Sequence, residues 1–340
     1  MLVIIPTAGI GSRLDLHTKH FNKSMIQLGD LPVISRIIES YPANAKFIII
    51  LGYKGDQIEE FLSLIYPKKK IKFVYVKNYD GKGSGLTLSL KASIKFINQP
   101  FFFHANDSIF TDKNFYKKIN KDTMFLSKGK SDTMKYASVE IKKDYKKIHY
   151  KMNFLKKGCF NYTGVGFVKD YRLFKKSLLN DQNNKGELAY FKNIEISKVN
   201  FVFIKKWFDI GSKETKEVAE KFFLNKKNIL PKYDQGIYFK NNKVYKFFTN
   251  PIIVEKRFIR SGILTEFVPK ILKKKKYLYV YDYIPGEVMS SSKNKLNNFK
   301  YLLKFLQNKF WIKKNLPKKK YLEFQSKCSS FYYEKTLSRI

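Results

Sequence analysis

The stretch that decides the fold is PTAGIGSRL, residues 6–14, which directly follows the apolar run of residues 1–5. An apolar run of strand length that ends in a glycine-containing turn is typical of the first strand of an α/β sheet. Backbone N–H groups in such a turn can contact phosphate oxygens. Two kinds of site use this pattern. One holds the pyrophosphate of a bound dinucleotide, and the other holds the pyrophosphate that leaves when a nucleotide is cleaved.

From this turn onward, apolar runs with strand character alternate with helical patterns as far as about residue 225. We expect strands at residues 2–5, 46–51, 72–76, 100–104, 162–168 and 200–205, and helices at residues 32–40, 57–65, 86–97 and after Ser212. The alternation predicts an α/β fold with a Rossmann-like mixed, mainly parallel sheet and flanking helices. Beyond the polar run of residues 225–228 and Pro231, which we interpret as a linker, short strands and turns predict a smaller α+β domain.

The chain has 340 residues, a formal net charge of +39 and 44% hydrophobic residues. This length and composition suit two folded domains rather than a disordered chain. The charge raises the alternative of a nucleic-acid-binding protein. However, only six of the 67 basic residues are arginine, the residue best suited to base and phosphate recognition. Lysine is spread along the whole chain, so we interpret most of the charge as solvated surface and expect no nucleic-acid partner.

The two cysteines, Cys159 and Cys328, lie far apart and have no metal-ligand spacing, which favours a reduced, cytoplasmic protein. The N-terminal apolar stretch is too short for a signal peptide and has no basic segment before it. The sequence contains no apolar run of 18 residues, so we expect no membrane span.

A dinucleotide-binding turn needs a third glycine and an acidic residue about twenty positions further on. Gly9 and Gly11 fit, but Leu14 occupies the third position, and Asp30 is only a forced candidate for the acid. A dinucleotide-dependent oxidoreductase therefore remains the weaker alternative.

The segment after the turn is more specific. Arg13 is followed ten residues later by Lys23, within Asn22-Lys-Ser-Met25. This pattern resembles the sugar-nucleotidyltransferase superfamily, in which a G-x-G-x-R loop precedes a lysine in a "PKxL"-like segment; here Asn22 replaces the proline. The resemblance implies a fold of the GT-A-like type, an NTP substrate and catalytic roles for Arg13 and Lys23. It also implies nucleotide binding at Ala8, Gly9, Gly11 and Ser12. Glycines admit phosphate to the backbone, and the two cations can neutralise a triphosphate.

Two acidic residues are candidates for a Mg²⁺ site. Asp107 follows the apolar strand predicted at residues 100–104, and ligands gather at the carboxyl ends of such strands. Asp209 lies in Trp207-Phe-Asp-Ile-Gly211, which resembles the W-x-D-x-G segment that completes the metal site in the superfamily. Mg²⁺ often takes one or two carboxylates and shares the phosphate oxygens of its substrate.

By the same resemblance, the loop containing Gly83, Ser84 and Gly85 lies beside the nucleobase and ribose. The resemblance places Tyr162, Gly164 and Glu187 on the side of a small phosphorylated acceptor. The sequences of residues 18–25, 83–85 and 207–211 are similar to those of the branch that contains phosphocholine and capsule-locus cytidylyltransferases. This branch implies CTP as the nucleotide, an acceptor such as phosphocholine, another phosphorylated amino compound or a sugar 1-phosphate, and a use in capsule or surface polysaccharide synthesis.

Residues 236–248 predict a hairpin with its turn at Asn241-Asn242, and residues 251–260 predict a helix. With the run 277–289, they resemble the N-terminal lobe of choline kinases and aminoglycoside phosphotransferases. That resemblance pairs Lys246 with Glu255 and places residues 281–284 at an adenine. Because no catalytic-loop motif follows Gly286, we expect no kinase activity from this chain. The predicted domains are residues 1–228, a nucleotidyltransferase domain, and residues 229–340, a partial kinase-like lobe.

Overall fold

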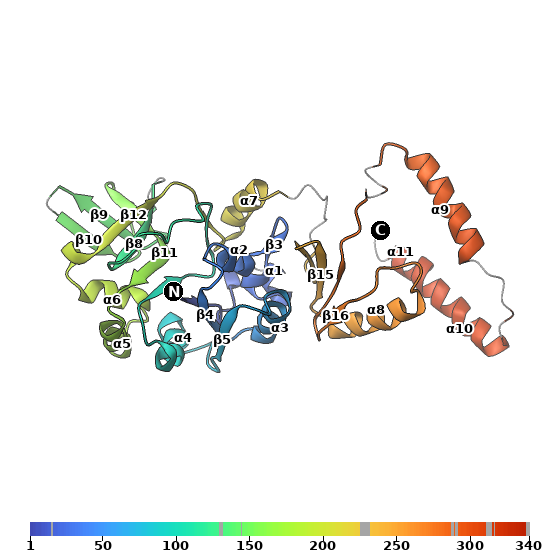
Figure 1. The fold of residues 1–340 in the computed structure, drawn as a ribbon, viewed down its shortest axis with the longest axis horizontal. Helices are drawn as coiled ribbons and strands as arrows, with labels where there is room; N and C mark the ends of the chain where they lie inside the picture. The colour runs from blue at the N-terminus through green and yellow to red at the C-terminus, as the bar shows by residue number, and fades with distance from the viewer. Residues whose placement is uncertain are drawn as a thin grey trace. The chain divides into compact units, whose positions relative to one another are not determined.

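The structure is a computed structural model that describes residues 1–14, 16–128, 132–143, 145–224, 232–286, 289, 292–310, 315 and 317–337 (Figure 1). It divides into two compact units, Met1–Ile284 and Pro285–Ile340. The predicted linker at residues 225–228 and Pro231, and with it the predicted domain boundary at residue 228, lies outside the described residues.

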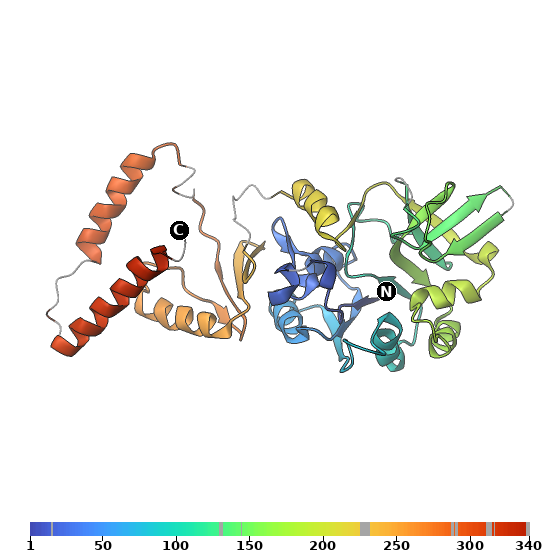
Figure 2. The same cartoon turned by 180° about the vertical axis from the view of Figure 1, so that it is seen from behind.

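The first unit is built around a sheet in which nine strands can be described, with the order β10-β9-β11-β6-β1-β4-β5 and with β8 and β12 attached through β11. The strands are β1 (Leu2–Pro6), β4 (Lys46–Leu51), β5 (Lys70–Tyr75), β6 (Phe101–His104), β8 (Thr123–Ser127), β9 (Ser138–Lys142), β10 (Tyr145–His149), β11 (Cys159–Val168) and β12 (Asn200–Ile204). The β6-β1-β4-β5 part is parallel, and β11 pairs antiparallel with β6, β8 and β9. The predicted α/β fold with a mixed, mainly parallel sheet is confirmed. Figures 1 and 2 show the β9–β10 hairpin at one edge of the sheet and β5 at the other.

Shorter elements connect these strands. The helices are α1 (Leu16–His20), α2 (Val33–Glu39), α3 (Gly55–Ile65), α4 (Leu86–Ser93), α5 (Tyr171–Leu179), α6 (Glu187–Asn193) and α7 (Lys213–Phe222). Single 3-10 turns are η1 (Ser12–Leu14), η2 (Lys23–Met25), η3 (Ile94–Phe96) and η4 (Ile196–Lys198). Two small ladders pair β2 (Gln27–Leu28) with β3 (Leu31–Pro32), and β7 (Ser108–Phe110) with β13 (Trp207–Asp209).

The sheet is buried on both faces because its central strands β1, β4 and β6 are apolar at nearly every position. Val3 and Ile5 of β1 belong to one core cluster, which includes residues of α2 and α3, whereas Leu2 and Ile4 belong to a second cluster with Leu90 of α4. A strand covered by helices on both faces has no reason to alternate apolar and polar residues. This explains the continuous run before the glycine turn.

A C-terminal sheet in the same unit has the order β14-β15-β17-β16 and is antiparallel. Its elements are β14 (Gln235–Lys240), β15 (Lys243–Phe248), β16 (Lys273–Lys274), β17 (Leu278–Asp282) and the helix α8 (Pro251–Ile263). Asn241 and Asn242 both have positive φ, +48° and +55°, as a two-residue hairpin turn requires, which confirms the predicted turn. The hydroxyl of Tyr238 donates to the carbonyl of Met25 at 2.8 Å, so this sheet shares the core of the first sheet.

The second unit contains α9 (Lys295–Lys309), α10 (Lys318–Ser329), a π-helical turn at Ser330–Glu334 and α11 (Lys335–Leu337). The residues of α9 and α10 are not buried. In the described part of the chain, helices that combine the length and the apolar character needed to cross a membrane are absent.

Candidate functional site

The glycine turn after β1 leaves its backbone open on one side. A Cβ atom built on Gly9 meets no atom within 4 Å, whereas one built on Gly11 lies 3.1 Å from Cγ2 of Thr18 and 3.2 Å from Cβ of Lys23. Gly11 also has φ of +74°, where side chains are disfavoured. Gly9 therefore gives a ligand access to the backbone, and Gly11 allows the turn to pack closely against Lys23.

The other predicted residues of the turn have different surroundings. Ala8 is buried, and its carbonyl accepts a hydrogen bond from the backbone N–H of Tyr53 at 2.9 Å. Ser12 and Arg13 begin η1 and are exposed. The turn is thus fixed at Ala8 and presents Arg13 to solvent.

Asn22, the residue that replaces the expected proline, fixes the position of the lysine segment. It is fully buried, and its Nδ2 donates to the carbonyls of Thr7 at 2.9 Å and Tyr53 at 2.6 Å. Its Oδ1 accepts from the backbone N–H of Ser24 at 2.9 Å and so caps η2. One side chain therefore connects η2 with the ends of β1 and β4.

Lys23 and Asp107 form an ion pair. Nζ of Lys23 lies 2.5 Å from Oδ2 of Asp107, and the lysine side chain is only 9% exposed. Burial raises the pKa of Asp107, but the charge and hydrogen bond of Lys23, with the charge of Arg13, outweigh it and hold the pKa below its ordinary value. The predicted catalytic cations and the predicted metal ligand therefore belong to one electrostatic cluster.

The small β7–β13 ladder brings the second acidic residue to the first. Asp209 is the register partner of Ser108, the residue that follows Asp107. The backbone N–H of Ile210 donates to the carbonyl of Asp107 at 2.8 Å. Asp107, directly before β7, and Asp209, in β13, are thus brought together although they lie about 100 positions apart in sequence.

The carboxylate of Asp209 is held by several donors. Its Oδ2 accepts from the hydroxyl of Tyr136 at 2.8 Å and lies 3.8 Å from Nζ of Lys135, and its Oδ1 accepts from the backbone N–H of Gly211 at 2.8 Å. Sequence reasoning missed Tyr136 and Lys135, because nothing in the segment that contains them indicates its contact with a distant carboxylate.

The donor set suits Mg²⁺, which commonly uses one or two protein carboxylates and completes its shell with water and phosphate oxygens. Asp107 and Asp209 supply two carboxylates at adjacent positions. A group of three or more ligating side chains is not found among the described residues.

The loop predicted to face the nucleobase contains three glycines with backbone angles that other residues rarely adopt. Gly81, Gly83 and Gly85 all have positive φ, of +76°, +85° and +151°. Added Cβ atoms on Gly81 and Gly83 would meet nothing within 4 Å, whereas one on Gly85 would lie 1.8 Å from Nδ2 of Asn184. The loop therefore has an open part at Gly81 and Gly83 and a packed part at Gly85, the N-cap residue of α4.

Asn184 connects this loop with the predicted acceptor side. Its Oδ1 accepts from the backbone N–H of Thr87, so it caps α4 from a distant segment at 2.9 Å. Asp181 accepts from the Thr87 hydroxyl and from the backbone N–H of Gly186 at 3.0 Å. Because Gly186 immediately precedes Glu187, the nucleobase loop and the acceptor candidate are joined by hydrogen bonds.

The acceptor candidates include two neighbouring buried polar groups. The hydroxyl of Tyr162 and Oε2 of Glu187 are buried and make no hydrogen bond of ordinary geometry. The pKa of Glu187 is raised to about 8, because burial, with a smaller contribution from the negative charge of Asp107, outweighs the lowering by its own backbone N–H and by Tyr162. The carbonyl of Gly164, on β11, accepts from the backbone N–H of Ala105 at 2.9 Å. β11 therefore places Tyr162 and Gly164 on the strand beside the loop that contains Asp107, whereas Glu187 is the first residue of α6.

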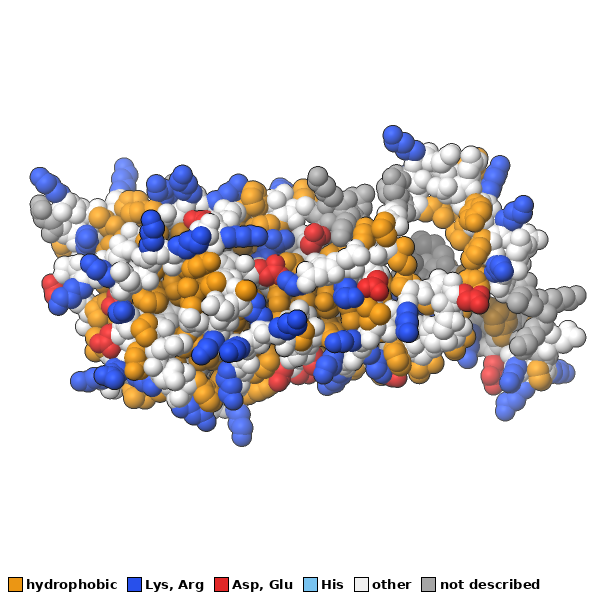
Figure 3. All heavy atoms as spheres, in the orientation of Figure 1, with side chains coloured by type: hydrophobic (Ala, Val, Ile, Leu, Met, Phe, Trp, Pro, Cys, Tyr) orange, Lys and Arg blue, Asp and Glu red, His pale blue; other side chains and the backbone are white. Residues whose placement is uncertain are grey.

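The two alternative functions gain no support. Asp30, the forced candidate for a ribose-binding acid, lies in the turn between β2 and β3 rather than at the end of a parallel strand, and its carbonyl accepts from the backbone N–H of Phe239 at 2.9 Å. Lysine and arginine side chains are spread over the face shown in Figure 3, among apolar and neutral side chains.

The predicted kinase-type ion pair is wrong. Glu255 of α8 pairs with Lys274 of β16 and not with Lys246. Lys246 lies on β15 near Arg257, and burial followed by the charge of that arginine lowers its pKa. Lys274, from the edge strand β16, therefore pairs with the carboxylate that the resemblance assigned to Lys246.

Comparison with known proteins supports the nucleotidyltransferase fold. No family model matches the chain. It is 26% identical over 249 residues to bifunctional protein GlmU of Methanococcus vannielii. The match covers 70% of this chain and 58% of GlmU, so the chain spans little more than half the length of that relative.

Solved structures share the fold at low identity. One is described as a putative glucose-1-phosphate thymidylyltransferase of Bacillus anthracis in complex with sucrose. Its TM-score is 0.54 and its identity 19%, and the match covers 68% of this chain and 98% of that structure. A UDP-glucose pyrophosphorylase complexed with UDP-glucose has a TM-score of 0.53 and 18% identity, and the match covers 65% of this chain and 97% of that structure. A UDP-glucose pyrophosphorylase from Acinetobacter baumanii has a TM-score of 0.51 and 14% identity, and the match covers 65% of this chain and 92% of that structure.

Proposed function

We propose that this chain is a Mg²⁺-dependent nucleotidyltransferase of the sugar-phosphate type. The observation that carries the proposal is the ion pair of Lys23 with Asp107 beside an open glycine turn, with Asp209 on the adjoining ladder. The similarity to GlmU and the fold shared with a thymidylyltransferase and two UDP-glucose pyrophosphorylases support it.

In the proposed reaction, a phosphate oxygen of the acceptor forms a bond to the α-phosphorus of an NTP. The bond from that phosphorus to the oxygen bridging to the β-phosphate breaks, and pyrophosphate leaves. The open backbone at Gly9 and the exposed Arg13 bind the triphosphate, and Lys23 stabilises the negative charge that develops on the leaving group. Asp107 keeps Lys23 in place through the ion pair.

Asp107 and Asp209 would hold Mg²⁺ when it binds, and the ion then supplies positive charge to the phosphate oxygens. The chain's own contribution at this point is positional. Tyr136 and the backbone of Gly211 orient Asp209, and Asn22 orients the segment that carries Lys23. Most of the rate acceleration in such a site comes from alignment and electrostatics.

The acceptor side favours a compound that can satisfy buried polar groups. The hydroxyl of Tyr162 and Oε2 of Glu187 are buried, interact with each other and make no hydrogen bond of ordinary geometry, so a ligand that donates hydrogen bonds or carries a positive charge offsets the cost of their burial. Both an amino or ammonium group and the hydroxyls of a sugar meet this requirement. The acceptor classes are therefore a phosphorylated amino compound, such as phosphocholine, and a sugar 1-phosphate.

We further propose CTP as the nucleotide and capsule or surface polysaccharide synthesis as the use of the product. The support for both is the sequence resemblance of residues 18–25, 83–85 and 207–211 to the cytidylyltransferase branch.

The experiment that tests the proposal measures pyrophosphate release. The protein is incubated with Mg²⁺, with ATP, GTP, CTP, UTP and dTTP in turn, and with a panel of acceptors that contains phosphocholine, phosphoethanolamine and several sugar 1-phosphates. We expect release with one acceptor class and highest with CTP. Release with UTP or dTTP alone would correct the nucleotide, and no release by a folded sample with any pair would refute the enzyme.

A further inference from the structure

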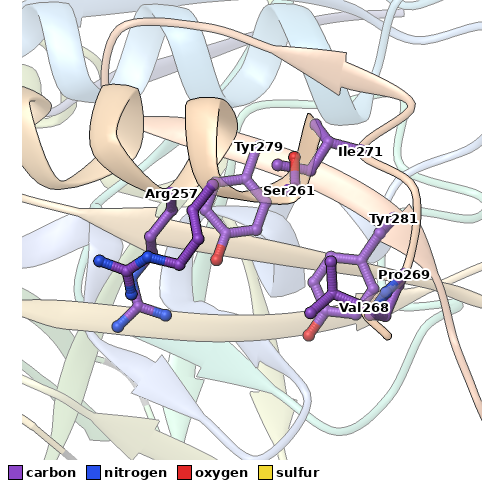
Figure 4. A pocket seen from close by; sticks show the side chains of 8 residues that line it. Arg257, Ser261, Val268, Pro269, Ile271, Tyr279 and Tyr281 are labelled. Atoms are coloured by element: carbon purple, nitrogen blue, oxygen red, sulfur yellow. The ribbon is translucent and has the colours of Figure 1, made fainter. Parts of the chain in front are cut away.

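A pocket in the C-terminal sheet has features of a small-molecule site and lies in different elements from the candidate active site. It has a volume of about 260 Å³ and lies between α8, the segment that follows it and β17 (Figure 4). Eight residues line it: Arg257, Arg260, Ser261, Val268, Pro269, Ile271, Tyr279 and Tyr281.

The two arginines are the first distinctive feature. The chain has only six arginines among 67 basic residues, and two of them line this one pocket. They are spaced i and i+3 on α8, so they lie on the same side of the helix. In a chain that uses lysine at most solvated positions, arginine at both places favours recognition of a planar or multidentate anion, because the guanidinium group donates several hydrogen bonds in a fixed geometry.

These arginines have no carboxylate partner. Among the described residues, no acidic oxygen lies within 4.0 Å of Arg257 or Arg260, and the nearby helix residue Glu255 is already paired with Lys274. Arg257 is positioned instead by the ring of Phe248, with its Cζ 4.9 Å from the ring centroid. Arg257 is therefore positioned by an aromatic ring, and in the described part of the chain neither arginine is paired with a carboxylate.

The remaining lining divides into a polar and an apolar part. The tyrosine at position 279 is buried, and Figure 4 shows its phenol directed toward the side of the pocket where Arg257 lies. Ser261 adds a hydroxyl group. Val268, Pro269 and Ile271 form an apolar wall and cannot contact an anionic group favourably. The complementary ligand thus has an anionic end and a carbon-containing end.

We propose that this pocket binds a small phosphomonoester, with Arg257 and Arg260 on the phosphate group and the apolar wall on the organic part. Two guanidinium groups match the charge of a phosphate dianion, whereas a single carboxylate needs only one. The volume lies below the roughly 300–1,000 Å³ of common ligand pockets, which selects a molecule smaller than a nucleotide. The proposal does not depend on the nucleotidyltransferase reaction.

The test is amide hydrogen exchange of the full chain with two probes, inorganic phosphate and ethyl phosphate. We expect both to slow exchange in α8 and β17, with ethyl phosphate effective at lower concentration because it also contacts the apolar wall. R257Q/R260Q should weaken this protection roughly tenfold or more, because charge-assisted hydrogen bonds are lost. Both side chains are exposed, so the variant should fold.

Two controls separate this pocket from the candidate active site. Lys256→Gln removes an exposed charge from the same helix without touching the pocket and should leave the protection unchanged. Lys23→Ala weakens phosphate binding at the other site and should also leave protection of α8 unchanged. The proposal is overturned if neither probe slows exchange in α8 of the wild-type chain, or if the protection is the same in R257Q/R260Q.

Discussion

Nζ of Lys23 and Oδ2 of Asp107 lie 2.5 Å apart although 84 positions separate the residues in sequence. Each side chain is the main counter-charge of the other. Burial raises the pKa of Asp107, and Lys23, aided by Arg13, reverses that effect. The pair therefore keeps a carboxylate ionised in the place where the proposed reaction needs one.

Replacing Lys23 by Ala should reduce pyrophosphate release by roughly 100-fold or more, the loss that follows removal of one transition-state charge contact. It should also raise the pKa of Asp107, because burial is then opposed chiefly by the exposed Arg13. Asp107→Asn should cause a loss of similar size. The matched control is Lys19→Ala, which removes an exposed lysine four residues away and should retain activity. Activity that survives in both site variants would refute the assignment.

Asn22→Ala should destabilise the chain by about 2 kcal/mol or more, because the carbonyls of Thr7 and Tyr53 lose a donor. Urea unfolding measures the effect, and the activity of the folded fraction should fall as well.

Asn22→Asp sharpens this test, because it keeps the acceptor for the backbone N–H of Ser24 but places an oxygen against the two carbonyls. We expect Asn22→Asp to be at least as destabilising as Asn22→Ala. A stability equal to that of the wild type would show that the donated hydrogen bonds contribute nothing.

The sequence predicted those parts of the fold and site that depend on neighbouring residues. The apolar strand before the glycine turn and the acid that ends the strand at residues 101–104 have local signatures, and Lys23 and Asp209 follow from motifs. Contacts between remote segments have no such signature. Asn184 caps α4 across 97 positions, and Tyr136 reaches Asp209 across 73.

The mistaken ion pair has the same origin. The resemblance to a kinase-type lobe pairs Lys246 with Glu255, but the partner of Glu255 is set by the side chains that reach it from the folded sheet. That partner is Lys274 of β16. The two-residue strand β16 is too short to be recognised from its sequence.

Gly85 and Gly83 form a matched pair for testing the nucleobase loop. Gly85→Ala should destabilise the chain and weaken NTP binding, because the new Cβ would overlap the side chain of Asn184, which caps α4. Gly83→Ala has open space around its Cβ and should cost only about 1 kcal/mol for its positive φ. Equal effects of the two variants on unfolding and on nucleotide titration would contradict this view of the loop.

His104 should make the chain sensitive to mild acid. Its Nε2 donates to the carbonyl of Ser108 at 2.9 Å, and its Nδ1 accepts from the hydroxyl of Tyr41 at 2.8 Å. Burial lowers the pKa of His104 to about 4. As the pH falls below about 6.5, His104 becomes protonated in the unfolded chain but stays neutral in the folded chain. The free energy of unfolding therefore decreases until about pH 4. The total loss of stability over this pH range is about 3 kcal/mol.

The contribution of His104 is isolated by comparison with His104→Gln, which cannot be protonated. Urea unfolding of both proteins at pH 7 and pH 5 should show a larger loss for the wild type. Parallel losses would mean that other groups cause the acid sensitivity.

Glu187 should act in the opposite pH range. Burial raises its pKa to about 8, so between about pH 4.5 and pH 8 the unfolded chain releases a proton that the folded chain keeps, and stability falls as the pH rises. Glu187→Gln removes this cost and should be more stable than the wild type by a few kcal/mol at pH 8.5, with little difference at pH 4.5.

The titration of Glu187 also discriminates between the two proposed acceptor classes. If the acceptor carries an ammonium group, its affinity for the wild type should rise as the pH passes about 8, because the ionised carboxylate pairs with the cation, and Glu187→Gln should abolish the rise. If the acceptor is a sugar 1-phosphate, the protonated and ionised carboxyl can both accept hydrogen bonds from hydroxyls, so its affinity should change far less across that range.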